Sequence, residues 1–213
     1  MGSSSVEILS LILTVSSFVS FILCSTTDCW RQDAKDPLSS VGLSSRCRGL
    51  WSECLFDNMA GIWTCDFLVS YLNEHPVALV VSRALVLIEG VLCFAAAPLL
   101  ILGMGCTTVI SNLDHHKQKF FTAAGIILLM AGFSGGTAVF WYAIDTATKY
   151  RTEVDLAVPG ITYELGYTYW LAAASALCAV TSALLLMYLN CKAGKRSICT
   201  IEPGIHNNAI TYL

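Results

Sequence analysis

Charged residues are scarce in this sequence, at 13% of 213 residues against 55% apolar residues. Soluble domains carry about 25% charged residues, so the composition argues against a chain that folds in water. Nucleophile elbows, phosphate-binding loops and zinc-ligand spacings are missing, and we therefore predict no enzyme, metal or cofactor. N-glycosylation sequons are missing as well, and with a net charge of −3 we predict no nucleic-acid partner.

Apolar residues are instead concentrated in four stretches, each as long as the roughly 20 residues that cross a bilayer. We predict transmembrane helices at 8–27, 76–104, 120–144 and 167–189. The first stretch has no basic segment before it and no clear small-residue cleavage site. We therefore expect a retained helix there and not a cleaved signal peptide.

Basic residues indicate the orientation of these helices. Lys117 and Lys119 follow the second stretch, and Lys192, Lys195 and Arg196 follow the fourth. Because short cytoplasmic segments collect Lys and Arg, both regions are expected in the cytoplasm, and an even number of spans places both termini there. The cytoplasmic segments are then 1–7, 105–119 and 190–213.

The two remaining segments, 28–75 and 145–166, are predicted to be extracellular loops. The first contains seven acidic and four basic residues, and the second contains four acidic and two basic residues. Both loops therefore carry net negative charge. The outer face of the protein is expected to be acidic.

Four of the ten cysteines, Cys29, Cys47, Cys54 and Cys65, fall in the first extracellular loop. Thiols pair in that oxidising compartment, and four cysteines allow three pairings. We favour Cys54 with Cys65, because the ten residues between them suit two neighbouring strands joined by a turn at Ala60-Gly61. Cys29 and Cys47 can form a second bridge, which the sequence leaves open.

Two features lie inside the predicted helices. Glu89 is an intramembrane acid, which is a functional candidate by default, although a structural role near Arg83 is the interpretation that we favour. Gly132 and Gly136 stand four residues apart, a spacing of small residues that allows close helix packing in lipid.

Several short motifs together resemble the signature of the claudin family of tight-junction proteins. The first loop contains Trp30, then Gly49-Leu50-Trp51, then Cys54 and Cys65. The resemblance extends over nearly the whole chain through Ser82-Arg83-Ala84-Leu85, Gly105-Cys106-Thr107, Trp141-Tyr142-Ala143, Pro159-Gly160 and Tyr163-Glu164-Leu165-Gly166. Within the family, the chain is most similar to the paracellin-type claudins, through Thr27-Asp28-Cys29-Trp30, Arg46-Cys47-Arg48 and Glu74-His75-Pro76.

The resemblance implies a membrane all-α fold, a left-handed four-helix bundle that carries a small antiparallel sheet built from both extracellular loops. Gly49-Leu50-Trp51 would then anchor the sheet between the helix tops, with Trp30 packed nearby. Both tryptophans also suit a bilayer interface, and the role is structural in either case. Arg83 would be costly in hydrocarbon, so we expect it at the outer boundary as a brace that bonds to the loop.

The resemblance also implies a function. Claudins polymerise within one membrane, meet partners on the next cell and line a pore between cells, so the implied partners are other claudins and permeating cations. By motif, Asp66 and Asp57 occupy the positions of the selectivity carboxylate in cation-conducting claudins, and Mg²⁺ or Ca²⁺ permeation is conceivable. The alternatives are solvated surface carboxylates, a barrier-forming claudin, or a regulatory tetraspan subunit of another channel.

Two cytoplasmic features complete the predictions. Thr211-Tyr212-Leu213 fits the terminal peptide by which claudins add a strand to PDZ scaffold proteins. Cys106 and Cys191 lie beside the inner ends of the second and fourth helices, where palmitoylation and unmodified reduced thiols fit equally well.

Overall fold

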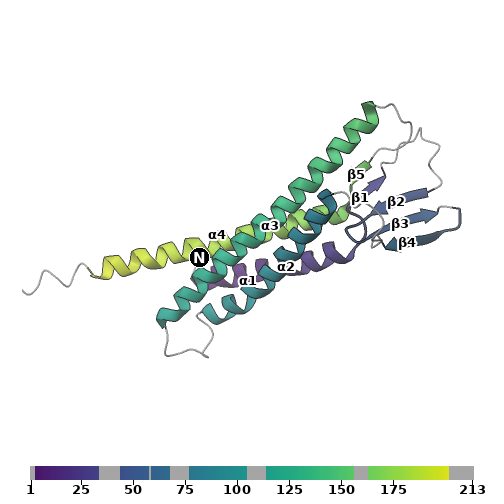
Figure 1. The fold of residues 1–213 in the computed structure, drawn as a ribbon. Coiled ribbons are helices and arrows are strands. Elements are labelled where there is room, and N and C mark those ends of the chain that lie inside the picture. The colour runs from purple at the N-terminus through teal and green to yellow at the C-terminus, as the bar shows by residue number, and fades with distance from the viewer. Residues whose placement is uncertain are drawn as a thin grey trace, which may run out of the picture.

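The computed structural model describes residues 3–33, 44–57, 59–67, 77–104, 114–155 and 163–201. Its helices are α1 (Ser3–Thr26), α2 (Val77–Gly103), α3 (Asp114–Asp155) and α4 (Tyr167–Ile201). Its strands are β1 (Arg31–Asp33), β2 (Ser44–Arg48), β3 (Ser52–Asp57), β4 (Ile62–Phe67) and β5 (Tyr163–Leu165). The helices form one elongated bundle, and the strands gather at one end of it (Figure 1).

All four helices are long and apolar enough to cross a membrane, over Ser5–Thr26, Val77–Gly103, Lys117–Thr152 and Tyr167–Lys192. A helix satisfies its own backbone hydrogen bonds, which lipid requires. Large apolar side chains such as Val91 and Phe133 point outward, 68% and 67% exposed, which suits contact with lipid tails. The predicted fold class, four membrane helices with a small antiparallel sheet, is confirmed.

The helices extend further than their apolar stretches. Helix α3 has 42 residues and continues through Asp155, so it takes in part of the predicted loop 145–166, and α4 continues past residue 189 to Ile201. At 1.5 Å per residue α3 is about 63 Å long, roughly twice the hydrocarbon thickness. Apolar patterning marks the part of a helix that lies in lipid, whereas its hydrogen bonding continues into water.

Two clusters of buried side chains fill the bundle. The cluster nearer the sheet contains Trp30 and Leu50 from the sheet region together with Val86, Tyr142 and Tyr169 from three helices. The other cluster is formed by the helices alone and is centred on fully buried side chains that include Leu100, Leu128 and Leu186. The first cluster therefore joins the sheet to the helices.

Hydroxyl groups connect α1 to α4 in a repeating pattern. Ser182 Oγ donates to the Ser10 carbonyl at 2.9 Å. Ser17 Oγ donates to the Ser175 carbonyl at 3.0 Å, and Ser175 Oγ lies 2.9 Å from the Ser17 carbonyl. These contacts recur every seven residues on both helices, in antiparallel register. Interhelical hydrogen bonds of this kind contribute about 0.6 kcal/mol each in membrane proteins.

Glycines on α3 contribute to packing, although not as the spacing predicts. A Cβ on Gly132 would collide with Val180 of α4, so this glycine allows close contact between the helices. Gly136 has no neighbouring atom within 4 Å of such a Cβ, and its expected packing role is wrong. Gly135 takes that place, because a Cβ there would collide with the Glu89 carboxylate of α2.

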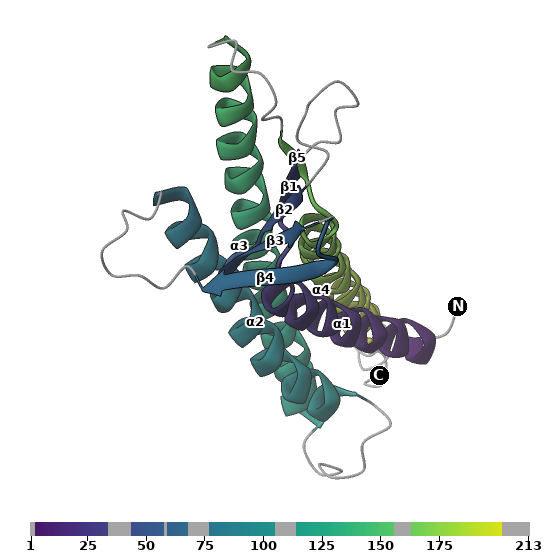
Figure 2. The same cartoon turned by 90° about the vertical axis from the view of Figure 1, so that its right-hand side faces the viewer.

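The sheet is antiparallel throughout, in the order β4-β3-β2-β1-β5. Strands β1 to β4 come from the segment between α1 and α2, and β5 comes from the segment between α3 and α4. Figure 2 shows β5 beside β1, with β4 at the opposite edge over the helix ends. The expectation that both loops build one sheet is confirmed.

Candidate functional site

The strand register divides the residues of β2, β3 and β4 between two faces. Directly opposed residues in an antiparallel sheet share a face. One face therefore carries three rows, which are Arg48 with Glu53 and Asp66, Arg46 with Leu55 and Thr64, and Ser44 with Asp57 and Ile62. We call it the polar face. It contains both carboxylates that the sequence proposes for ion selectivity.

The opposite face carries the cysteines. Cys47, Cys54 and Cys65 occupy one row across β2, β3 and β4. Cys54 is bonded to Cys65, with Cα atoms 4.1 Å apart, which is the pairing that the sequence favours. Cys29 is bonded to Cys47, with Cα atoms 4.7 Å apart, which settles the bridge that the sequence leaves open. We call it the disulfide face.

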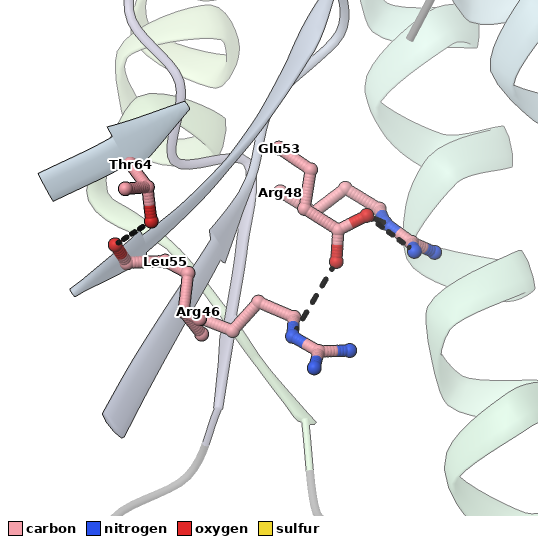
Figure 3. A network of polar contacts seen from close by, with 5 residues as sticks. All are labelled: Arg46, Arg48, Glu53, Leu55 and Thr64. Carbon is pink, nitrogen blue, oxygen red and sulfur yellow. Dashed lines mark hydrogen bonds and ion pairs between the residues drawn. The ribbon is translucent and has the colours of Figure 1, made fainter. Parts of the chain in front are cut away.

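A triad of charged side chains lies on the polar face (Figure 3). Arg48 donates to Glu53 Oε2 at 2.7 Å, and Arg46 Nε lies 3.5 Å from Glu53 Oε1. Glu53 is only 20% exposed, whereas the two arginines are 50% and 36% exposed. Two positive groups therefore bind one carboxylate, and Glu53 has little negative field to offer an ion.

Asp57 closes β3 and holds the hairpin turn. Its Oδ1 accepts hydrogen bonds from the backbone amides of Met59 at 2.8 Å and Ala60 at 3.3 Å. Gly61 completes the turn with a φ of 66°, a conformation that glycine adopts without steric cost. The Asp57 side chain is exposed and has no ion-pair partner among the described residues. Its charge is therefore available to solvent, although one oxygen serves the turn.

Asp66 belongs to β4, the edge strand of the sheet, and the register places it opposite Glu53. Its row runs Arg48, Glu53, Asp66, from an inner strand to the edge. The structure thus brings Asp66 and the triad together, with Asp57 two rows away.

The sheet is fixed to the bundle by a second group of residues. Trp30 is fully buried, donates from Nε1 to the Cys24 carbonyl at 2.8 Å, and contacts the Tyr142 ring edge-on with centroids 5.1 Å apart. Leu50 is 1% exposed in the same cluster. Arg83 donates from Nε to the Leu50 carbonyl, and its guanidinium lies 5.1 Å from the Trp51 ring centroid.

The sequence does not predict the surroundings of Glu89. Its side chain is 1% exposed and Oε1 accepts a hydrogen bond from Ser175 of α4 at 2.8 Å, while the carboxylate lies against Gly135 of α3. The sequence alone shows that Glu89 is an acid inside an apolar stretch and therefore a candidate. Its partners come from two distant helices, and no spacing in the chain connects them.

Three predicted features belong to the part of the chain after α2 and near its end. Cys106 and Thr211-Tyr212-Leu213 lie outside the described residues. Cys191 is exposed on α4, which runs on beyond the apolar stretch. Among the described side chains, no group of three His, Cys, Asp or Glu residues is placed to hold a metal ion.

Four membrane-length helices beside a disulfide-linked sheet, with Gly49 and Leu50 buried where the two meet, define a tetraspan membrane protein with a sheet domain at one end. The profile of the PMP-22/EMP/MP20/Claudin family matches residues 4–186, and the chain belongs to this family.

The relatives are claudins. The chain is 37% identical to Claudin-16 of Rattus norvegicus over 176 residues, 81% of this chain and 73% of that protein. It is 37% identical to Claudin-16 of Homo sapiens over 77% of this chain and 69% of the relative, and 26% identical to Claudin-7 of Homo sapiens over 87% and 86%. The predicted resemblance to the paracellin-type claudins, of which Claudin-16 is one, is confirmed.

Proposed function

We propose that this claudin assembles with other claudins at tight junctions and forms a cation-selective paracellular channel. The observation that carries the proposal is the charge arrangement on the polar face. Arg46 and Arg48 are bonded to Glu53, and the other two acidic residues that the register places on this face are Asp66 at the sheet edge and Asp57 at the hairpin.

Electrostatics gives this arrangement its effect. A carboxylate about 4 Å from a monovalent cation contributes roughly 4 kcal/mol at an effective dielectric near 20. That energy exceeds thermal energy several-fold, attracts cations, repels chloride and offsets partial dehydration. The Asp57 carboxylate also accepts bonds from two backbone amides, which reduces what it offers to an ion. Carboxylate oxygens also suit Mg²⁺ and Ca²⁺, which are hard cations.

A selectivity carboxylate must be held at a constant position. The contacts that fix the sheet to the helices support this. We assign Arg83 the role of a brace, supported by its bond to the Leu50 carbonyl and its contact with Trp51. Trp30 and Leu50 bury the base of the sheet in the helix tops. Both disulfides join neighbouring parts of the same sheet.

The remaining assignments follow the same proposal. The sheet lies outside the cell and both termini lie in the cytoplasm, where Thr211-Tyr212-Leu213 binds PDZ scaffold proteins and Cys106 and Cys191 are available for palmitoylation. The protein conducts and adheres and performs no catalysis. Other claudins are its partners within one membrane and across the junction.

Expression in a tight epithelial monolayer tests the function. We expect lower transepithelial resistance and a sodium-to-chloride dilution potential that favours sodium, with MgCl2 and CaCl2 gradients reporting divalent permeation. A rise in resistance without charge preference would identify a barrier claudin. Delivery to the membrane outside junctions, with no effect on resistance, would identify a regulatory tetraspan subunit.

A further inference from the structure

Three extracellular cysteines, Cys47, Cys54 and Cys65, form one row across the sheet, and the fourth, Cys29, is bonded to its inner end at Cys47. Cys47 and Cys54 are register partners on β2 and β3, yet each is bonded to a different cysteine. Opposed residues in antiparallel strands have Cα atoms about 4.5 to 5.5 Å apart. Disulfides form at Cα separations of about 4.4 to 6.8 Å. A bridge from Cys47 to Cys54 would therefore fit the sheet with little backbone movement.

The cysteine side chains differ in exposure to solvent, and this decides which sulfur an external thiolate attacks first. Cys54 is 6% exposed and Cys29 is 3% exposed, whereas Cys65 on the edge strand is exposed. Thiolates attack disulfide sulfurs only where they have access. An external thiolate therefore reaches the sulfur of Cys65 first, and the sulfur released by that attack is that of buried Cys54.

We propose that Cys65 is an acceptor site for a small external monothiol and that its modification moves the disulfide inward along the row. The external thiolate bonds to Cys65 as the Cys54–Cys65 bond breaks, and Cys54 leaves as a thiolate. Cys54 then bonds to Cys47 as the Cys29–Cys47 bond breaks, and Cys29 leaves as a thiolate that takes a proton from water. One external thiol is consumed, one protein thiol is released at Cys29, and the number of disulfides stays at two because one of them is now the mixed disulfide.

The bonds before and after the exchange show this balance. Before the reaction there are two protein disulfides and a free external thiol. Afterwards there are the Cys47–Cys54 bridge, the mixed disulfide at Cys65 and the free thiol of Cys29, so two disulfides and one thiol are conserved throughout. The reaction is therefore an exchange and needs no oxidant or reductant beyond the monothiol.

The rearrangement would change which strands are covalently joined. In the structure, the Cys54–Cys65 bridge joins β3 to β4. The Cys29–Cys47 bridge joins Cys29, just before β1, to β2. After exchange, only β2 and β3 would be joined, and the edge strand β4 would lose its covalent connection. Because β4 carries Asp66, exchange would loosen the carboxylate that we assign to selectivity. This consequence for permeation rests on the proposed function, whereas the exchange itself does not.

Disulfide mapping of the full-length protein tests the exchange. The protein, in lipid nanodiscs, is treated with increasing reduced glutathione, alkylated with iodoacetamide, cleaved at aromatic residues including Trp51 and Phe56, and analysed by mass spectrometry. We expect a Cys47–Cys54 linked peptide, glutathione on Cys65 and alkylated Cys29. Loss of the Cys54–Cys65 bridge while Cys29–Cys47 stays intact and no Cys47–Cys54 peptide forms would overturn the proposal.

A variant tests the same step without added thiol. In Cys29→Ser, the free thiol of Cys47 lies opposite the Cys54–Cys65 bridge, and we expect part of the protein to carry Cys47–Cys54 with Cys65 free. The matched control is Cys191→Ser, which removes an exposed thiol from α4 and should keep the wild-type linkages. Only Cys54–Cys65 bridges in Cys29→Ser would also overturn the proposal. Linkage maps are read without ion flux, so this test and the test of channel function can fail separately.

Discussion

At the scale of single residues, the field at the polar face depends on how acids and arginines are distributed over three strands. Arg46 and Arg48 sit on β2 and share Glu53 of β3, so the basic groups lie on the inner part of the face. Asp66 and Asp57 lie at the sheet edge and at the turn. Removing an arginine should therefore act in the opposite sense to removing an acid.

Arg46→Gln is expected to increase cation preference. Arg46 is 50% exposed, and its loss would release part of the Glu53 charge on the polar face. We expect the sodium-to-chloride dilution potential of a monolayer to move further toward sodium. Lys192→Gln is the matched control, because Lys192 is an exposed lysine on α4, many turns along the helix from its sheet-side start at Tyr167. An unchanged potential in Arg46→Gln, or a shift toward chloride, would contradict the assignment of the polar face.

At the scale of elements, helix contacts depend on small residues and hydroxyls at specific positions. Gly135 lies against the Glu89 carboxylate, which also accepts a hydrogen bond from Ser175. The acid of α2 is thereby held between α3 and α4. The Ser175 hydroxyl satisfies one carboxylate oxygen, which lowers the cost of burying a polar group in an apolar surrounding.

Gly135→Ala should destabilise the protein, because the added methyl group would occupy the space of the Glu89 carboxylate. Overpacking of this kind costs about 1 to 3 kcal/mol. The measurement is thermal unfolding in detergent. Gly136→Ala is the control on the adjacent residue, where the methyl group meets open space and alanine is the better helix former. Equal melting temperatures for the two variants would show that the contact with Glu89 is unimportant.

The elements also show what sequence patterns can predict. Runs of apolar residues predict the four helices, because the bilayer imposes a length on them. The extension of α3 to Asp155 is not predicted, because polar residues continue a helix without an apolar signal. Cys54 and Cys65 are predictable from their spacing and the turn at Gly61, whereas the 17 residues between Cys29 and Cys47 give no comparable turn signal.

At the scale of the whole molecule, the sheet must stay fixed on the bundle for a selectivity site to keep its shape. The described contacts that hold it come from distant parts of the chain. Arg83 of α2 bonds to Leu50, and Trp30 bonds to the end of α1 at Cys24. Resemblance to claudins indicates that these residues are structural, and only the folded chain identifies their partners.

Arg83→Gln is expected to weaken the attachment of the sheet. It removes the charged donor to the Leu50 carbonyl and the cation above the Trp51 ring. Hydrogen bonds to charged groups contribute about 1.5 to 3 kcal/mol, so we expect a lower melting temperature and less protein at the cell surface by biotinylation. Arg151→Gln, an exposed arginine near the end of α3, is the control. Normal surface delivery and stability of Arg83→Gln would contradict the brace.

The charge on Asp66 is the centre of the proposed function, and one substitution pair tests it most directly. Glu164 lies on β5 opposite Gln32, whose other partner is Cys47, so Glu164 belongs to the disulfide face. Asp66→Asn and Glu164→Gln therefore remove the same charge from opposite faces of one sheet. We expect the sodium-to-chloride dilution potential to lose most of its cation preference in Asp66→Asn and to keep it in Glu164→Gln. Retained cation preference in Asp66→Asn, at equal junctional protein, would contradict the account.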